Sequence, residues 1–255
     1  MSELPALNVS ISDCITDSVE VRILANTALT PAALSLLDFG IKAFVEAGAR
    51  GGYPVSSGAP EHSSLSLASG LTPDSSGCRF ILEARKITRN CFQLLRHMLS
   101  KPELPACELQ QIQVRDSSGH KAELLPEIDE DLEVDLYPAM ADNLAFTLEY
   151  GDDVFSKSRR VEVEFSAPIG APEIASFKPY AQAWGSLLEA GAFALPYDLP
   201  DVQESVMGQV TQFDSHSAEI EVPVYLVSEE GWNVLINILH TFSKRELAIV
   251  RVLLE

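Results

Sequence analysis

The sequence has only four cysteines, and none of them forms a CxxC pair. Their spacing matches no zinc motif, and a chain of this size without a secretory signal rarely depends on disulfides, so we expect four free thiols. They are Cys14, Cys78, Cys91 and Cys107. No apolar run approaches the roughly 18 residues that a membrane helix needs. The N-terminus lacks the basic flank and apolar run of a signal peptide, so we expect a cytoplasmic protein that does not enter a membrane.

Basic residues are scarce as well. The chain has 18 Lys and Arg against 37 Asp and Glu, a net charge of −19 at pH 7. Nucleic acids and anionic membranes require a cationic surface, so we expect neither as a partner. The acidity fits solubility alone, and it also fits a basic protein partner. It is uneven, with a net charge of −2 over residues 1–117, −6 over 118–141 and −11 over 142–255, so we predict that any protein partner meets the second half.

Motifs that carry chemistry are absent from the sequence. It contains no HExxH, no GxSxG and no Cys/His pair with zinc spacing. Residues 48–52 are rich in glycine but follow a predicted helix, whereas a phosphate loop follows a strand, so capping and a turn explain them. Cys91 falls on the apolar face of a helix, which favours a buried, inert thiol. The sequence therefore assigns no catalytic residue, no metal and no cofactor, and leaves open whether the protein is an enzyme.

What the sequence does contain is an internal similarity. The tripeptide VEV occurs at residues 19–21 and again at 161–163, and EAGA occurs at 46–49 and again at 189–192. The offsets are 142 and 143 residues, so one residue is gained in the loop between them. Repeats of this kind predict that one structural unit occurs twice.

Apolar residues share one helical face at corresponding places in the two copies. The spacing is i, i+3, i+7, i+10, i+11, and the residues 143 positions further on are apolar too. These residues are Leu34, Leu37, Ile41, Phe44 and Val45, and Phe177, Tyr180, Trp184, Leu187 and Leu188. A second pair of helices is predicted around Phe92 and Trp232. His97 and His240 fall on these helices, where we expect surface or boundary residues rather than ligands.

The ends of the first helix in each copy carry capping residues. Thr30 followed by Pro31 predicts the start of the helix in the first copy. Gly48 and Gly191 lie where a C-terminal capping glycine is expected.

Strands complete each copy in the order β-β-α-β-β-α-β. Alternating apolar residues predict a strand pair at the start, a hairpin before the second helix and a strand at the end. Without its first strand the order is that of the split βαβ unit, so each copy resembles the ferredoxin-like fold. We therefore predict an α+β protein with antiparallel sheets, each covered by two helices. Pro223 inside the second hairpin predicts an edge strand or a bulge.

The chain divides into three parts by this alignment. Residues 1–117 form the first α+β copy, residues 118–141 an acidic connecting segment, and residues 142–255 the second α+β copy. The connecting segment is either an exposed linker or an edge strand with its acids outward. Apolar residues at every second position favour some strand there: Leu132, Val134 and Leu136.

Three classes of function remain open. The first is a non-catalytic cytoplasmic protein-binding module, of which an acidic inhibitor or immunity-type protein for a basic partner is one form. The second is a small-molecule binder or enzyme with its site in the crevice between the copies, where pockets tend to form. The third is a structural subunit of a homo-oligomer.

Acidic residues and two aromatic residues are the candidates for binding sites. The acids expected to meet a partner are Asp129, Asp131, Asp135, Glu229 and Glu230. The first three do not form a calcium loop, because the central glycine and terminal glutamate of an EF-hand are missing. Tyr180 and Trp184 are core residues by their spacing, and they are also the candidates for a ligand pocket because they carry polar tips.

Overall fold

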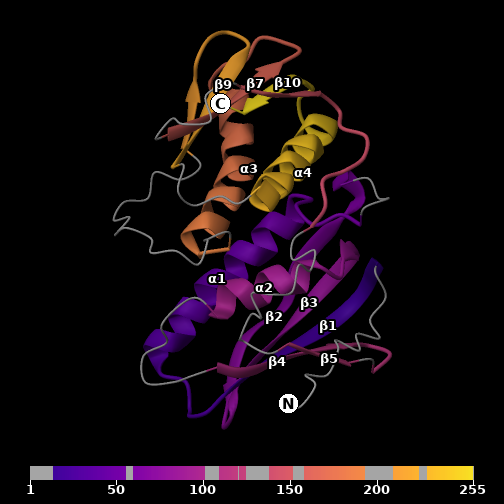
Figure 1. Ribbon diagram of the computed structural model, residues 1–255, viewed down its shortest axis with the longest axis vertical. Coiled ribbons are helices and arrows are strands. Elements are labelled where there is room, and N and C mark those ends of the chain that lie inside the picture. Colours follow the sequence, from indigo (N-terminus) through magenta and orange to yellow (C-terminus); the bar gives the residue numbers. More distant parts are fainter. Residues whose placement is uncertain are drawn as a thin grey trace, which may run out of the picture.

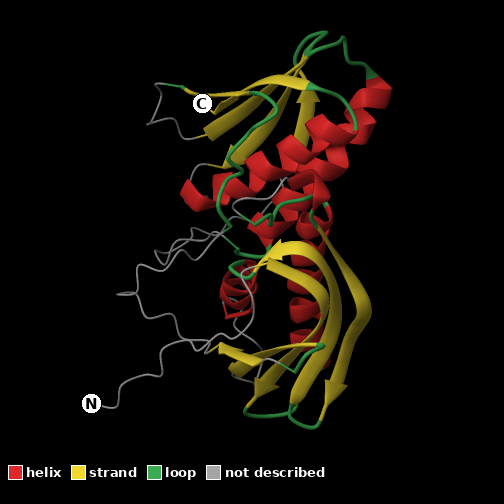
Figure 2. Ribbon diagram, turned by 90° about the vertical axis from the view of Figure 1, so that its right-hand side faces the viewer, coloured by secondary structure: helices red, strands yellow, loops and turns green. Residues whose placement is uncertain are grey.

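The computed structural model describes residues 14–55, 60–100, 109–119, 121–124, 138–151, 158–192, 209–223 and 229–254. Within these ranges the chain is an α+β protein with two five-stranded sheets and four α-helices. Helices α1 and α2 accompany the first sheet and α3 and α4 the second (Figure 1). Figure 2 shows the helices in the middle of the molecule with one sheet at either end. Helix α1 contacts α3, so the two units meet through their helices.

The first unit contains five strands, two α-helices and a short 3₁₀ helix. Its elements are β1 (Cys14–Ala25), α1 (Pro31–Ala49), η1 (Pro60–His62), β2 (Ser64–Asp74), β3 (Gly77–Thr88), α2 (Cys91–Ser100), β4 (Leu109–Asp116) and β5 (Lys121–Leu124). The strand order is β2-β3-β1-β4-β5, and all neighbours are antiparallel. Central strand β1 buries Val19, Val21 and Ile23 and turns the residues between them outward, as a half-buried strand requires.

The second unit contains five strands and two helices. Its elements are β6 (Thr147–Tyr150), β7 (Ser158–Phe165), α3 (Ala171–Glu189), β8 (Gln209–Gln212), β9 (Ser217–Pro223), α4 (Glu229–Arg245) and β10 (Ile249–Leu254). The strand order is β6-β10-β7-β9-β8. Strand β6 pairs with β10 in parallel. The prediction of an antiparallel sheet is therefore wrong for this edge, because β6 joins the far side of β10 instead of pairing with β7, the next strand along the chain.

The first helix of each unit lies where the periodicity predicts it. Thr30 caps α1, since its side-chain oxygen accepts a hydrogen bond of 3.2 Å from the backbone N–H of Ala33. Gly191 follows α3 with φ of +75°, the left-handed conformation of a capping glycine. Gly48 does not play this role: it lies inside α1, and a Cβ there would come within 2.6 Å of the Cβ of Leu65. Gly48 therefore allows α1 to pack closely against β2.

Other predicted features are corrected or lie outside the described residues. Pro223 does not mark an edge strand, because β9 lies between β7 and β8 and the proline is its last residue. Residues 121–124 of the predicted connecting segment form β5 and extend the first sheet. Residues 8–12 and 125–137, including Leu132, Val134 and Leu136, lie outside the described ranges, so the choice between linker and strand there stays a prediction.

Candidate functional site at the junction of the two units

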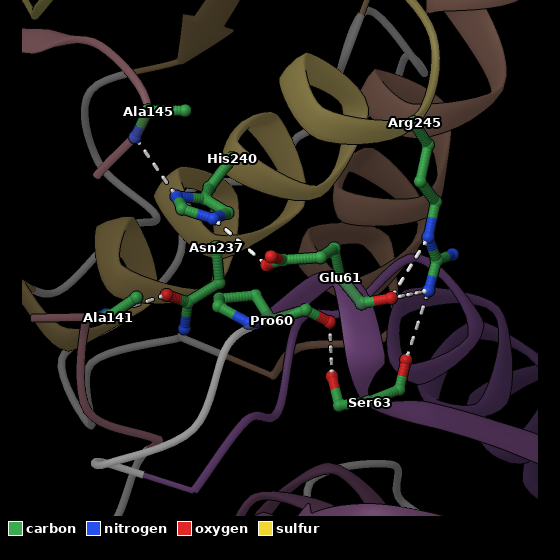
Figure 3. Close-up of polar contacts among 8 residues, drawn as sticks. All are labelled: Pro60, Glu61, Ser63, Ala141, Ala145, Asn237, His240 and Arg245. Atoms are coloured by element: carbon green, nitrogen blue, oxygen red, sulfur yellow. Dashed lines mark hydrogen bonds and ion pairs between the residues drawn. The ribbon is translucent and has the colours of Figure 1, made fainter. Parts of the chain in front are cut away.

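A buried polar face of α4 occupies the junction of the two units (Figure 3). Asn237, His240 and Thr241 are 0%, 3% and 0% exposed. Their spacing of three and four residues places them on one side of the helix, and Arg245 follows one turn later. This side faces residues 49–52 and 60–63 of the first unit and the segment 138–146 that leads into β6. We call this set of contacts the junction.

The side-chain amide of Asn237 bonds to both of these segments. Its Oδ1 accepts a hydrogen bond of 2.9 Å from the backbone N–H of Ala141. Its Nδ2 donates to the carbonyl of Ala139 at 3.0 Å and to the carbonyl of Gly52 at 3.3 Å. One buried side chain thus joins the first unit, the connecting segment and α4.

His240 also contacts both segments, one through each ring nitrogen. Nδ1 accepts a hydrogen bond of 3.1 Å from the backbone N–H of Ala145, and Nε2 lies 3.1 Å from Oε2 of Glu61. Because a backbone N–H can only donate, Nδ1 must carry a lone pair and the proton of the neutral ring lies on Nε2. Burial lowers the pKa of His240 below its ordinary value of 6.5, by more than Glu61 raises it. The ring is therefore neutral at pH 7.

Glu61 is ionised at this contact. Burial opposes its ionisation, but its own backbone N–H and His240 together lower its pKa below the ordinary value of 4.5. The pair is thus a neutral imidazole donating to a carboxylate. Both ring nitrogens of His240 are engaged, so neither is free to take a proton from a substrate in this arrangement.

Arg245 closes the other side of the junction. Its Nε donates to the backbone carbonyl of Glu61 at 3.2 Å, and its Nη2 donates to the same oxygen. Its terminal nitrogens also reach the carbonyls of Ala49 and Ser63, each at 3.4 Å. Ala49 is the last residue of α1, where a cation interacts favourably with the helix dipole. The hydroxyl of Ser63 donates to the carbonyl of Pro60 at 2.7 Å and holds η1 in shape.

The glycine turn after α1 is shaped to approach α4. Gly51 has φ of +82°, and a Cβ there would lie 2.1 Å from Oγ1 of Thr241 and 2.7 Å from the carbonyl oxygen of Pro60. At Gly52 a Cβ would lie 3.1 Å from Cγ1 of Val234. The glycine-rich run is thus a turn, as predicted, and it is also a place where the first unit approaches α4 closely.

Substitution of Gly51 by alanine is expected to lower the free energy of unfolding by at least about 2 kcal/mol, since it combines a left-handed conformation with a clash against Thr241. Chemical denaturation measures the loss. Gly70 is the matched control, because a Cβ there meets nothing within 4 Å, and Gly70→Ala should have little effect. Equal effects of the two substitutions would contradict the close approach.

An apolar groove lies where the end of α3 meets α1 and α2. It has a volume of about 200 Å³ and is lined by Leu36, Phe39, Gly40, Met98, Leu99, Glu189, Ala190 and Gly191. These residues come from α1, from the last turn of α2 and from the end of α3, so both units contribute to it. We call it the inter-unit groove.

Two features give the inter-unit groove an apolar and negative character. The side chains of Leu36 and Phe39 are each 43% exposed, which is unusual for neighbouring large apolar residues on one helix face. The C-terminal ends of α2 and α3 both line the groove, and helix C-termini carry partial negative charge. Glu189 is exposed on its rim and forms no hydrogen bond or ion pair with any other described residue. The groove thus suits an apolar group that has a cation beside it.

The aromatic residues considered for a ligand pocket are buried in the second unit. Trp184 is fully buried, its ring centroid lies 5.3 Å from that of Trp232, and its Nε1 donates to the carbonyl of Gly231 at 3.1 Å. Tyr180 packs edge-on against Phe242. Its ring also lies 4.6 Å from the guanidinium of Arg50, which places Tyr180 at the edge of the junction. Neither residue lines the inter-unit groove.

The remaining predicted site residues are placed as follows. Asp129, Asp131 and Asp135 lie outside the described ranges. Glu229 and Glu230 form the first turn of α4, and their side chains are not described. These acids therefore stay predictions as partner-binding residues.

The sequence did not identify the residues of the junction. His240 and His97 are buried, 3% and 9% exposed, so the expectation of ordinary surface or boundary residues is wrong. Cys91 is buried as predicted, and burial raises the pKa of its thiol well above the ordinary value. A signal for the junction was present in the spacing of Asn237 and His240, because the two polar residues occur within 232–242, a stretch of α4 whose other residues are mostly apolar.

Comparisons with protein families, with curated proteins and with solved structures find no match for this chain. Among the described residues, no group of three or more His, Cys, Asp or Glu is placed to hold a metal ion. The described helices include none that is long and apolar enough to cross a membrane.

Proposed function

We propose that this chain is a non-catalytic cytoplasmic protein that binds a basic protein partner, and that the inter-unit groove receives an apolar side chain of that partner. The observation that carries the proposal is the groove itself, where exposed Leu36 and Phe39 meet two helix C-termini and the exposed Glu189. Protein interfaces are commonly anchored by a large side chain in a pocket with a polar rim. An acidic inhibitor or immunity-type protein is one form that such a binder takes.

The negative net charge of the chain supports the proposal of a basic partner. The chain carries a net charge of −19. The outward face of the second sheet adds to this field, because its charged residues are mostly acidic: Glu149, Glu162, Glu164, Glu219 and Glu221, with Arg160 and Arg251. Such a field speeds the approach of a basic protein and disfavours acidic ones.

The size of the groove favours a protein partner over a small molecule. Small-molecule pockets usually enclose about 300–1,000 Å³, and the groove measures about 200 Å³. This volume suits one large side chain. The groove does lie between the two units, as the alternative of a ligand site in the crevice requires, so a small apolar amine is the second candidate ligand.

We also propose that the two units arose by duplication of a ferredoxin-like unit. The strand orders β2-β3-β1-β4 and β8-β9-β7-β10 support this, because corresponding strands hold corresponding places and every pair in these runs is antiparallel. The sequence offset of 142–143 residues between the copies supports it as well. Superposition of experimentally determined units through two helices and four strands each would test this proposal.

A random peptide-display library screened against the immobilised chain tests the binding proposal. Peptides that pair a large apolar residue with Lys or Arg are expected to be enriched, because their side chains match the groove and its rim. Enrichment of acidic peptides, or of none, would contradict the proposal. Binding of small apolar amines without any binding of peptides would favour the second candidate.

Substitution of Phe39 by serine should weaken binding of an enriched peptide about tenfold, since truncating a central contact costs more than about 1 kcal/mol. Phe213→Ser is the matched control, because Phe213 is 63% exposed in the turn between β8 and β9 and does not line the groove. Titration calorimetry with both variants measures the difference. Equal affinities for the two variants would place the binding site elsewhere.

A further inference from the structure

His240 connects three parts of the molecule through one ring. The ring belongs to α4 of the second unit, its Nδ1 accepts from Ala145 in the segment 138–146, and its Nε2 faces Glu61 of the first unit. The ring is 3% exposed, so water cannot easily replace either contact. A change in the protonation of this ring must therefore change the contacts themselves.

The two contacts respond to a proton in opposite directions. A proton taken from solvent onto Nδ1 occupies the lone pair that the N–H of Ala145 uses, and two donors then face each other. At the other nitrogen, the Nε2–H now belongs to a cation and its hydrogen bond to the Glu61 carboxylate becomes charge-assisted and stronger. No other bond has to form or break.

We propose that the junction is a pH-sensitive latch, in which protonation of His240 releases Ala145 and the segment before β6 while it strengthens the contact between α4 and the first unit. This inference does not depend on the proposed partner. It makes the neutral ring the form that holds the connecting segment and the charged ring the form that holds Glu61. The protonation state of His240 thus decides which contact is favoured, the one with Ala145 or the one with Glu61.

The charged groups around the ring set the pH at which His240 takes up its second proton. From η1, Glu61 favours the charged ring, and His62 lies beside it in sequence. On α4 itself, Lys244 opposes the charged ring and Arg245 adds a second cation to the junction. The segment 138–146 contributes one charged residue, the exposed Asp142.

The sign of the pH dependence follows from the folded-state pKa of His240, which burial lowers below 6.5. As pH falls below 6.5, the unfolded chain takes up a proton before the folded chain does. The stability that the neutral ring contributes is therefore complete above pH 6.5 and decreases as pH falls toward the folded-state pKa. Release of Ala145 is expected in the same acid range.

Amide hydrogen exchange followed by NMR tests the latch on the full chain. Protection relative to an unstructured chain is compared at about pH 7.5 and at a lower pH, below the ordinary histidine pKa, where the ring ¹⁵N shifts show that both nitrogens of His240 are protonated. The protection of the Ala145 amide should fall about tenfold or more at the lower pH. The Ala141 amide is the internal control, because it bonds to Asn237, which does not titrate, and it should keep its protection.

Two substitutions of His240 distinguish the role of Nδ1 from the role of Nε2. Asparagine at position 240 keeps an acceptor near the place of Nδ1 but does not titrate, so His240→Asn should leave Ala145 protected at both pH values. Glutamine keeps an amide near the place of Nε2 and loses that acceptor, so His240→Gln should leave Ala145 unprotected at both. Glu61→Gln should move the transition of Ala145 to lower pH, because the charged ring loses its carboxylate.

Several results would overturn the latch. Unchanged protection of Ala145 between the two pH values would do so, and so would parallel loss at Ala145 and Ala141. Retention of the pH response in His240→Asn would show that another group titrates. If the variants do not fold, the ring ¹⁵N shifts of the unmodified protein decide, because a protonated Nδ1 at neutral pH contradicts the proposal.

Discussion

Replacing Trp232 with alanine is expected to lower the free energy of unfolding by about 3–5 kcal/mol, because removal of a large buried ring leaves a cavity. The indole is 6% exposed and lies against Trp184 between α3 and α4. Phe92→Ala should have an effect of the same size in the first unit, where Phe92 is 4% exposed and its ring centroid lies 6.4 Å from that of Phe44. Denaturation by urea measures both losses.

The matched control for these substitutions is Phe213→Ala. Phe213 is 63% exposed, so its loss should change the stability by no more than about 0.5 kcal/mol. A loss below about 1 kcal/mol for Trp232→Ala would contradict its place in the core. The shape of the transition is informative as well: if the junction joins the units into one cooperative structure, both substitutions shift a single transition.

Asn237→Leu is expected to lower the free energy of unfolding by about 3 kcal/mol or more. Leucine fills a similar volume, but it leaves the N–H of Ala141 and the carbonyls of Ala139 and Gly52 without their buried partner. Each such loss costs about 1–3 kcal/mol, which exceeds what the added apolar surface returns.

The control for this substitution lies on the same helix. Asn233 is partly exposed one turn before Asn237, so Asn233→Leu tests the effect of an added leucine without the loss of the junction. Denaturation midpoints and slopes measured together separate a change in stability from a change in cooperativity. Equal effects at the two positions would show that the three hydrogen bonds of Asn237 do not stabilise the junction.

Helices were the part of the fold that the sequence predicted best. Leu37, Ile41 and Phe44 repeat at helical spacing, and all three are buried on one face of α1. Such a repeat is a local property, and packing against a sheet satisfies it directly. The partner of β6 could not be predicted in this way, because four residues with an alternating pattern fit either β7 or β10 equally well.

The junction could not be predicted because its residues depend on contacts far apart in the sequence. His240 and Glu61 are 179 residues apart, and Asn237 and Gly52 are 185 residues apart. Polar residues on a helix usually face water, which is why His240 was expected at the surface. Gly51 is a similar case. The glycine-rich sequence around it predicts a turn, but it does not predict that Thr241 of α4 lies close to that turn.

The inter-unit groove could not be predicted from the sequence either, because it too depends on contacts between distant segments. Leu36 and Phe39 lie on the side of α1 opposite the buried Leu37, Ile41 and Phe44, so helical spacing indicates their exposure but not the neighbours that they meet. Only the folded chain reveals that the ends of α2 and α3 line a groove together with these residues. Glu189 belongs to the repeated EAGA sequence, so its place on the rim was hidden by its similarity to Glu46.

Amide NMR shifts of the chain, recorded with and without a peptide that pairs a large apolar residue with lysine, test the central claim most directly. We expect the largest changes at Leu36, Phe39 and Gly40 of α1, at Met98 and Leu99 of α2, and at Gly191 after α3, because these residues line the inter-unit groove. Shift changes confined to the outer faces of the sheets, or no binding by such peptides at all, would contradict the account.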